Sequence, residues 1–349
     1  MRIGLVRRGY SNAGGAESYL RGFAQAAVAE GHEVLLLASQ IWPDWTAGEQ
    51  SVIPGKSPVA FSKNLSLSAP KCDVLFSLER VSACDVFRVG DGVHAAWLER
   101  RARFSTAWQR FSFPINPKHR ALLRLEKEAL TSAKRVIVNS RMVQEEIARF
   151  YGSEIAEKTA LVYNGIDVEK WRAAPASLEE LRRELGLSLE EKVAVFVGSG
   201  WARKGLPWAE AATREAGFTL LVCGNGRLPA RSAGHVRFLG VERPVATVLH
   251  AADAFILPTI YDPFSNATLE ALAVGLPIIT STANGVAEIL DPAIDGTAVA
   301  DPSDIPALAA ALTDWKKRDS PQLRHLRQQK AAYHTLKRNF SATLHIIAS

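Results

Sequence analysis

Two carboxylates, Asp262 and Glu270, stand on either side of the expected start of a helix. Ser265 or Asn266 can cap that helix, because a short side-chain oxygen accepts a hydrogen bond from an N–H group of the first turn. Amides at a helix N-terminus bind anions, and carboxylates accept hydrogen bonds from sugar hydroxyls. The stretch could therefore hold a phosphorylated sugar. A simpler interpretation, which the spacing alone favours, makes Asp262 the helix cap and Glu270 a solvated acid.

The elements around these acids alternate between strand and helix. The apolar run 254–257 predicts a buried strand, residues 267–274 predict a helix, and residues 278–280 begin the next strand. Further strands are expected at 3–6, 33–38, 73–77, 86–89, 135–139, 158–163, 192–197, 219–223 and 236–239. Strands that alternate with helices predict parallel sheets covered on both faces. We therefore expect an α/β protein of two doubly wound domains, a linker near residues 164–175 and a ligand in the cleft between the domains.

Other polar residues follow expected strands. Gly14 and Gly15 lie in the first strand–helix turn, where glycines let a ligand approach the backbone, although such a turn is often only a turn. Asp91 and His94 follow the strand 86–89, at the end of the sheet where α/β folds place ligands. Asp91 could orient or deprotonate a hydroxyl group. His94 could contact a ligand, or it could be a packed, hydrogen-bonded histidine.

Three further features have two interpretations each. Arg203 and Lys204 can bind phosphate, with arginine offering two parallel donors, or they can be a solvated loop pair. Gly224 and Asn225 can lie near a bound base or form an ordinary turn. The segment 97–127 mixes basic and aromatic residues, which suits either an anionic membrane surface or a core helix with a solvated face. Nothing in it resembles a nucleic-acid-binding module.

Composition limits the partners and the compartment. The chain has 349 residues, 47% of them hydrophobic, with a formal net charge of +6 and a pI near 9.3, which favours an anionic partner. Its three cysteines lack metal-site spacing and suggest a reducing compartment. No signal peptide or membrane span is expected. We expect a cytoplasmic protein whose membrane contact, if any, is peripheral, on the inner face of the plasma membrane.

Several short motifs together resemble glycosyltransferase family 4, whose members are retaining enzymes with the two-domain GT-B fold. The motifs occur in the family's order across nearly the whole chain: Gly14-Gly-Ala-Glu17, Gly31-His-Glu-Val34, Asn164-Gly-Ile-Asp167, Arg203-Lys-Gly205, the Asp262 to Glu270 spacing, Gly275-Leu-Pro277 and Asn284-Gly-Val-Ala-Glu288. The segments 198–205 and 261–266 look most like the branch that contains the lipopolysaccharide core α-1,3-glucosyltransferase.

The resemblance implies a GT-B protein with two Rossmann-like domains, an acceptor-side domain at 1–165 and a donor-binding domain at 166–324, with a C-terminal helix at about 325–349 packing back on the first. It implies transfer of a hexose, glucose from UDP-glucose in the first instance, to a saccharide or lipid-linked saccharide of the cell envelope. No cofactor and no metal are required, and the chain has no Asp-x-Asp motif to hold Mg²⁺. Catalytic roles would fall to Asp91, Arg203, Lys204 and Asp262. Donor contacts would come from Gly14, Gly15, His94, Gly224, Asn225, Phe264, Ser265, Asn266, Ala267 and Glu270, of which Glu270 would hold the ribose.

One departure and two alternatives remain. The first acid of the family motif is usually Glu and is Asp262 here, which is shorter by one methylene and leaves the donor sugar open. The change also suits a nucleotide-sugar-binding protein without transferase activity. A nicotinamide-dependent dehydrogenase has doubly wound sheets as well. However, the first turn lacks G-x-G-x-x-G, and no acid ends the second strand, at 38–40.

Overall fold

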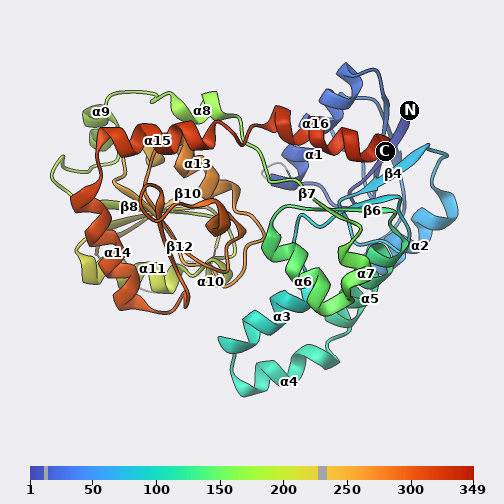
Figure 1. The fold of residues 1–349 in the computed structure, drawn as a ribbon, viewed down its shortest axis with the longest axis horizontal. Coiled ribbons are helices and arrows are strands. Elements are labelled where there is room, and N and C mark those ends of the chain that lie inside the picture. Colours follow the sequence, from blue (N-terminus) through green and yellow to red (C-terminus); the bar gives the residue numbers. More distant parts are fainter. Residues whose placement is uncertain (12–14, 227–233) are drawn as a thin grey trace. The chain divides into compact units, whose positions relative to one another are not determined.

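The computed structural model describes residues 1–11, 15–226 and 234–349. It divides into two compact units, shown in Figure 1. The first unit comprises Met1–Asn164 and Leu336–Ser349, and the second comprises Gly165–Thr335. No helix in the described part of the chain is long and apolar enough to cross a lipid bilayer.

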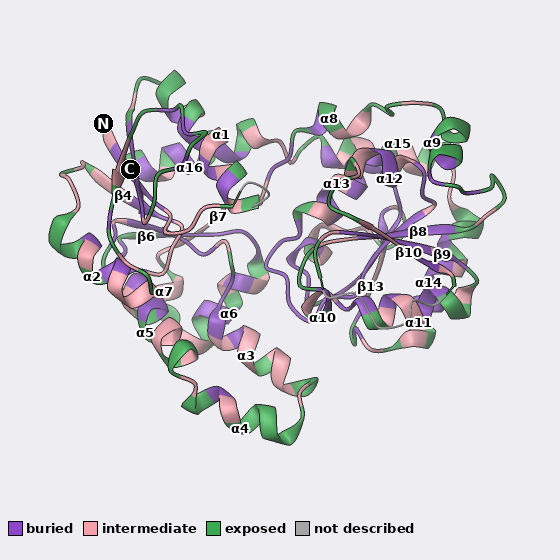
Figure 2. Cartoon of the chain, turned by 180° about the vertical axis from the view of Figure 1, so that it is seen from behind, coloured by how far each residue is buried: buried purple, intermediate pink, exposed green. Residues whose placement is uncertain are grey.

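The first unit is built on a parallel sheet with the strand order β3-β2-β1-β4-β5-β6-β7. The strands are β1 (Arg2–Val6), β2 (Glu33–Ala38), β3 (Glu49–Val52), β4 (Val74–Ser77), β5 (Val86–Arg88), β6 (Arg135–Val138) and β7 (Thr159–Leu161). The chain runs outward from β1 to β3, then returns to the other side of β1 and continues from β4 to β7. The central strands are buried on both faces, as Figure 2 shows in purple, which explains their continuous apolar sequences.

Helices cover this sheet on both faces. They are α1 (Gly15–Ala29), α2 (Pro58–Ser68), α3 (His94–Arg103), α4 (Ala107–Ile115), α5 (Pro117–Ser132), α6 (Arg141–Tyr151), α7 (Ser153–Ala156) and α16 (Leu336–Ala348). The C-terminal helix α16 packs on α1, where the rings of Phe23 and Phe340 lie with centroids 6.0 Å apart within one apolar core.

The second unit repeats the doubly wound plan with six parallel strands in the order β10-β9-β8-β11-β12-β13. The strands are β8 (Val193–Val197), β9 (Thr219–Cys223), β10 (Val236–Gly240), β11 (Ala254–Leu257), β12 (Ile278–Ser281) and β13 (Gly296–Val299). The helices are α8 (Val168–Arg172), α9 (Leu178–Glu184), α10 (Trp201–Lys204), α11 (Leu206–Ala216), α12 (Val245–His250), α13 (Asn266–Val274), the 3-10 helix η1 (Gly285–Ile289), α14 (Ile305–Arg318) and α15 (Pro321–Ala331). The α/β fold class predicted from strand–helix alternation is therefore confirmed.

Each sheet reverses its winding direction at one point, between β1 and β4 in the first unit and between β8 and β11 in the second. Ligands of open α/β sheets bind beyond the carboxyl ends of the strands at such a switch point. Arg7 follows β1 in the first unit, and the two segments that follow β8 and β11 in the second unit begin at Gly198 and Pro258. These segments are therefore the first places to look for a site.

The C-terminal end of the second unit differs from the prediction. The sequence predicts that unit to end near residue 324 and one helix at about 325–349 to pack on the first unit. Instead, α15 belongs to the second unit, which ends at Thr335, and α16 alone belongs to the first. The physical reason is Arg327, which is buried in the second unit and donates hydrogen bonds to the carbonyls of Gly275 and Ile294 at 2.6 and 2.7 Å.

Candidate functional site

The segment after β8 is a tight turn that leads into α10. Gly198, Gly200 and Gly205 all have positive φ angles, of 156°, 74° and 80°. A Cβ atom on Gly205 would lie 1.9 Å from the carbonyl oxygen of Pro258, so only glycine fits at this position. The turn after β8 is thereby pressed directly against the segment that follows β11.

Hydrogen bonds join these two segments along their length. The carbonyl of Arg203 accepts from the amide of Ile260 at 2.9 Å and from the hydroxyl of Thr259 at 3.1 Å. The guanidinium of Arg203 donates to the carbonyl of Tyr261 at 2.7 Å. Arg203 and Lys204 are therefore not a solvated loop pair. They are half-buried cations held at the switch point of the second sheet.

Lys204 pairs with Asp262, which brings two of the residues predicted to act in catalysis into direct contact. Both side chains are largely buried, with 12% and 8% of their surfaces exposed. Burial lowers the pKa of Lys204 below its usual value, while the Asp262 carboxylate acts in the opposite direction. Asp262 is therefore not the helix cap that the simpler interpretation suggests, but the counter-ion of Lys204.

The backbone of Asp262 is anchored to the chain around Asn284. The amide of Asp262 donates to the carbonyl of Ala283 at 2.9 Å, and the carbonyl of Asp262 accepts from the amide of Gly285 at 2.8 Å. The fully buried side chain of Asn284 donates to Thr268 and Thr280 at 3.1 Å each. The Asn284 motif thus holds both the Asp262 loop and the first turn of α13.

The N-terminus of α13 lies directly after this loop. Ser265 caps the helix, because its hydroxyl oxygen accepts from the amide of Thr268 at 3.3 Å, while its own amide donates to Asn284. Of the predicted donor contacts here, Phe264 and Ser265 are buried, Ala267 is half-buried, and Asn266 is exposed. The positive end of the α13 dipole therefore follows Asp262 closely in the sequence, and the segment around Asn284 is hydrogen-bonded to both.

Glu270 lies in the second turn of α13 and is half-buried rather than solvated. Burial raises the pKa of this carboxyl group to about 7, and Lys170 of α8 opposes the shift. A carboxyl group with a pKa near neutrality is common at functional sites, although structural networks also produce one.

Gly224 and Asn225 follow β9 and lie against the turn after β8. A Cβ atom on Gly224 would lie 2.3 Å from the carbonyl oxygen of Gly198, so the two turns are in close backbone contact. The amide of Asn225 donates to the hydroxyl of Ser199 at 3.1 Å. Gly224 and Asn225 therefore lie close to the turn that contains Arg203 and Lys204, beyond the carboxyl ends of β8 and β9.

In the first unit, Asp91 belongs to a charged cluster at the edge of the sheet where β1, β4 and β5 end. Its carboxylate lies 3.9 Å from the guanidinium of Arg7, which also lies 3.5 Å from Glu79. The buried Glu17 accepts two hydrogen bonds from the same guanidinium, at 3.1 and 3.2 Å. One cation thus serves three carboxylates, and the Asp91 side chain is the most exposed of them, at 63%.

His94 is a packed, hydrogen-bonded histidine at the start of α3. Its Nε2 atom lies 3.1 Å from Nδ1 of His119, and its backbone amide donates to both carboxylate oxygens of Glu126 at 2.9 Å. Burial, with Arg80 nearby, lowers the pKa of His94 to about 4. The imidazole is therefore neutral at physiological pH and can still accept or donate one hydrogen bond to a ligand.

Of the two glycines predicted in the first strand–helix turn, only Gly15 can be placed. Gly14 lies outside the described residues. Gly15 is the first residue of α1 and is exposed.

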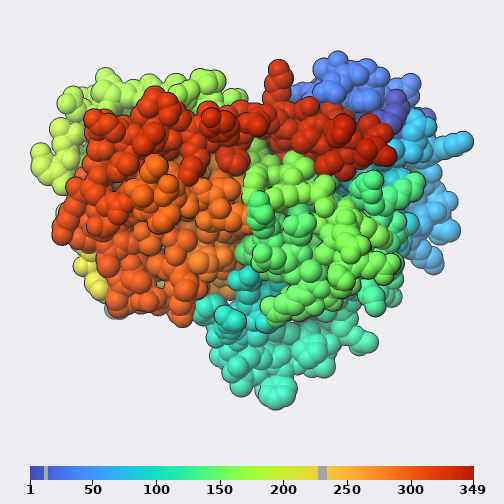
Figure 3. Space-filling model, viewed as in Figure 1, coloured from blue at the N-terminus to red at the C-terminus, as the bar shows by residue number. Residues whose placement is uncertain are grey.

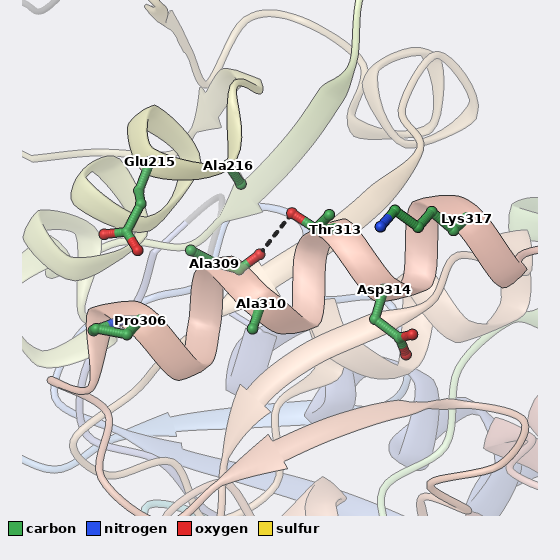
Figure 4. A pocket seen from close by; sticks show the side chains of 8 residues that line it. All are labelled: Glu215, Ala216, Pro306, Ala309, Ala310, Thr313, Asp314 and Lys317. Atoms are coloured by element: carbon green, nitrogen blue, oxygen red, sulfur yellow. Dashed lines mark hydrogen bonds between the residues drawn. The ribbon is translucent and has the colours of Figure 1, made fainter.

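A shallow hollow of about 400 Å³ lies elsewhere, between α11 and α14 (Figure 4). Its lining residues are Glu215, Ala216, Pro306, Ala309, Ala310, Thr313, Asp314 and Lys317. In Figure 4 the hydroxyl of Thr313 points back to the carbonyl of Ala309, to which it donates at 3.0 Å. None of the residues predicted to bind a donor lines this hollow, so it is separate from the predicted site.

Two family models match the sequence. Residues 13–170 match the model described as Glycosyltransferase Family 4, and residues 191–317 match the model described as Glycosyl transferases group 1. A curated protein of Burkholderia thailandensis, described as a probable transglycosylase, is 28% identical over 84% of this chain and 80% of its own length. Other curated relatives, such as the alpha-maltose-1-phosphate synthase of Mycobacterium tuberculosis, match over about half of each chain. The chain is a glycosyltransferase.

Solved structures establish the GT-B fold of this glycosyltransferase. WaaG, described as a glycosyltransferase involved in lipopolysaccharide biosynthesis, superposes with a TM-score of 0.79 at 21% identity over 99% of both chains. HepE of Anabaena, in a crystal structure with UDP-glucose, superposes with a TM-score of 0.73 at 17% identity over 99% of both chains.

Sequence reasoning missed several charged residues that the glycosyltransferase places beside the predicted ones. Arg7 lies 3.9 Å from Asp91, and Glu79 lies 3.5 Å from Arg7. Arg80 and Glu126 hold the turn between Asp91 and His94. Arg7, Glu79 and Arg80 follow the ends of β1 and β4, which is the one signal that could have found them. Glu126 lies inside a helix far along the chain, where no motif marks it.

Proposed function

We propose that this glycosyltransferase moves a hexose, glucose in the first instance, from UDP to a saccharide acceptor of the cell envelope, with retention of configuration and without a metal ion. The pairing of Lys204 with Asp262 beside Arg203 and the α13 N-terminus carries the proposal. It collects two cations and a helix dipole at the switch point of the second sheet, where a diphosphate needs them. HepE, a protein of the same fold, has been crystallised with UDP-glucose, which supports the choice of donor.

The cations would act on the leaving group. Departure of UDP from the sugar builds negative charge on the β-phosphate oxygens, and donors already in position stabilise that charge without reorganising. Arg203 donates one N–H group to the carbonyl of Tyr261, and this hydrogen bond fixes the orientation of its guanidinium. The Lys204 side chain would move so that its ammonium group leaves the Asp262 carboxylate and binds the diphosphate.

Asp262 would then be released to accept hydrogen bonds from hydroxyl groups of the donor sugar. Ionised carboxylates are acceptor-only groups with two oxygens, which suits two neighbouring hydroxyls. Asp262 is shorter than the usual Glu, but its backbone is fixed by Ala283 and Gly285, so its reach depends on the loop position rather than on side-chain flexibility.

The acceptor would be bound by the first unit. Asp91 is exposed and lies 3.9 Å from Arg7, which suits a carboxylate that orients an acceptor hydroxyl. The neutral His94 ring would supply a hydrogen bond to donor or acceptor. By resemblance to retaining members of the family, a phosphate oxygen of the donor takes the acceptor proton, so no enzyme nucleophile is assigned.

The pKa of Glu270 makes donor use depend on pH. An acid is ionised above its pKa, and only the carboxylate can accept hydrogen bonds from both ribose hydroxyls. With a pKa of about 7 in the free protein, Glu270 should make kcat/KM for UDP-glucose rise as pH increases through neutrality. Steady-state rates between about pH 5.5 and pH 8.5 measure this dependence. Glu270→Gln should lack the rise, and an identical pH profile in both proteins would contradict the ribose assignment.

Helix α4 offers a surface for an anionic membrane, where a lipid-linked acceptor would lie. Trp108, Phe111 and Ile115 are 85%, 75% and 74% exposed, and their spacing places them on one face of the helix. Exposed basic residues surround them, namely Arg103, Arg110, Lys118, Arg120 and Arg124. The segment lies in the teal part of the surface in Figure 3 and is largely exposed in Figure 2. Apolar anchors flanked by cations are typical of peripheral membrane contact.

Replacing Trp108, Phe111 and Ile115 together with serine should weaken binding to vesicles that contain phosphatidylglycerol by at least about tenfold, because the apolar contribution is lost. Vesicle co-sedimentation measures the effect. The matched control is Leu67→Ser, which changes a side chain on α2 that is 74% exposed. Leu67→Ser should bind vesicles as the natural chain does. Equal binding by the natural chain, Leu67→Ser and the triple serine variant would contradict membrane contact through α4.

The test of the proposed function is release of UDP from UDP-glucose, with and without a cell-envelope glycan extract, in buffer containing EDTA. We expect release that depends on the extract and persists in EDTA, with glucose appearing on the acceptor in α-linkage. No turnover across a panel of UDP-, GDP- and ADP-sugars would refute transfer from nucleotide sugars. Turnover that stops in EDTA would refute metal independence alone.

A further inference from the structure

We propose that Glu126 and Arg80 are positioning residues for the transfer, because together they hold the Asp91–His94 turn in its working geometry. The inference rests on the proposed function, in which Asp91 orients the acceptor and His94 contacts the donor or the acceptor. Neither Glu126 nor Arg80 would touch a substrate. Their role would be to fix the backbone that carries the two groups that do.

The turn is held at both of its ends by one ion pair. Glu126 of α5 accepts the backbone N–H of His94 at 2.9 Å and the Nε–H of Arg80 at 2.7 Å. Arg80 in turn donates from Nη2 to the carbonyl of Gly92 at 2.8 Å. The carbonyl on one side of Val93 and the amide on its other side are therefore tied to the same pair of side chains.

The turn itself has one short-range hydrogen bond, from the amide of Gly92 to the carbonyl of Val89 at 3.2 Å, and neither Gly92 nor Val93 has a polar side chain to add another. Gly92 has a φ angle of 73°, a conformation that favours glycine and leaves the chain flexible when unsupported. The residue at the N-cap of α3 is Val93, which has no side-chain acceptor for the first amides of the helix. The Glu126 carboxylate supplies the missing cap from a helix far along the chain, and its negative charge also suits the positive end of the α3 dipole.

Burial makes the arrangement specific. Glu126 is 0% exposed, and its remaining capacity is taken by the hydroxyl of Tyr151, which donates to it at 2.6 Å. Burying a carboxylate costs free energy unless both of its oxygens accept hydrogen bonds, and here three donor groups satisfy them. Two of those three donor groups connect Glu126 to the Asp91–His94 turn, the His94 amide directly and Arg80 through its bond to the Gly92 carbonyl.

The test uses Glu126→Gln in the full chain. The glutamine keeps the size of the side chain and an oxygen for the His94 amide, but its NH₂ group cannot accept from Arg80, so Gly92 loses its tie. We expect kcat for transfer to the acceptor to fall about 100-fold, the loss that a displacement of about 1 Å can cause. The dissociation constant for UDP, measured by calorimetry, should stay within about twofold, because Arg203, Lys204 and Glu270, proposed to bind the diphosphate and the ribose, lie on the second unit.

Two further variants separate positioning from stability. Tyr151→Phe removes one hydrogen bond from the same carboxylate but leaves both ties to the turn, so its kcat should stay within about twofold of the natural chain. Glu126→Gln combined with Arg80→Met also removes the half-buried cation that has lost Glu126 as its partner, and should recover much of the melting temperature lost in the single variant. Its kcat should nevertheless stay low, because the turn is still untied.

Each outcome has one meaning. A natural chain that transfers sugar while Glu126→Gln keeps its kcat overturns this inference and leaves the proposed function standing. Recovery of kcat together with melting temperature in the double variant also overturns it, because Glu126 would then act through stability alone. A natural chain that transfers no sugar from any donor refutes the proposed function, and this inference is overturned with it.

Discussion

Replacing Arg203 and Lys204 together with alanine should lower kcat/KM for UDP-glucose about 1,000-fold, because each cation makes a charge-assisted hydrogen bond of about 1.5–3 kcal/mol to the departing diphosphate. The loss should be specific to the phosphates. UDP should bind far more weakly, whereas uridine, which lacks the diphosphate, should bind with nearly unchanged affinity. Calorimetric titration with both ligands, beside steady-state rates, measures the difference.

The control for this variant carries the same loss of charge elsewhere in the second unit. Arg214→Ala combined with Lys317→Ala removes two exposed cations from α11 and α14. It should leave kcat/KM within about twofold, because exposed charges away from a site are screened by salt. Equal losses for UDP and uridine in the Arg203 and Lys204 variant would contradict phosphate binding by these residues.

Replacing Gly205 with alanine should destabilise the second unit more than a glycine-to-alanine change at any other glycine of its site. The residue has a φ angle of 80°, and an added Cβ atom would lie 1.9 Å from the carbonyl oxygen of Pro258. The backbone strain alone costs about 1–2 kcal/mol, and the overlap forces the segments after β8 and β11 apart. Because Arg203 and Lys204 precede this glycine, activity should fall with stability.

Gly217→Ala is a matched control for the Gly205 prediction. Gly217 has a similar φ angle of 69°, but an added Cβ atom would meet nothing within 4 Å. Both variants share the backbone strain, and only Gly205→Ala adds the overlap. Calorimetry should therefore show a melting temperature at least about 5 °C lower for Gly205→Ala than for Gly217→Ala, and equal values would contradict the close contact between the two segments.

Periodicity in the sequence predicted most strands because they are buried on both faces. Ile3–Val6 and Ala254–Leu257 are continuous apolar runs, and both lie inside observed strands. The strand β3 was missed, because Glu49–Val52 lies at the sheet edge and contains little apolar sequence. Pro114 lies inside α4, and the break between α4 and α5 comes at Asn116.

The parts of the site that depend on local sequence were predictable. The parts that depend on contacts between distant residues were not. A helix cap at Ser265 or Asn266 followed from residue type alone, and the structure shows that Ser265 is the cap. The contact between Lys204 and Asp262 spans 58 residues, and that between Arg80 and Glu126 spans 46. Neither pair has a periodic signal, because each forms only when segments far apart in the sequence meet in the folded chain.

A crystal structure of the protein with UDP-glucose tests the central claim most directly. We predict a diphosphate within hydrogen-bond distance of the Arg203 and Lys204 side chains and the α13 amides. We also predict that Lys204 has left Asp262, whose carboxylate then faces the glucose hydroxyls. A diphosphate bound elsewhere, or one bound while Lys204 still pairs with Asp262 and makes no phosphate contact, would contradict the account.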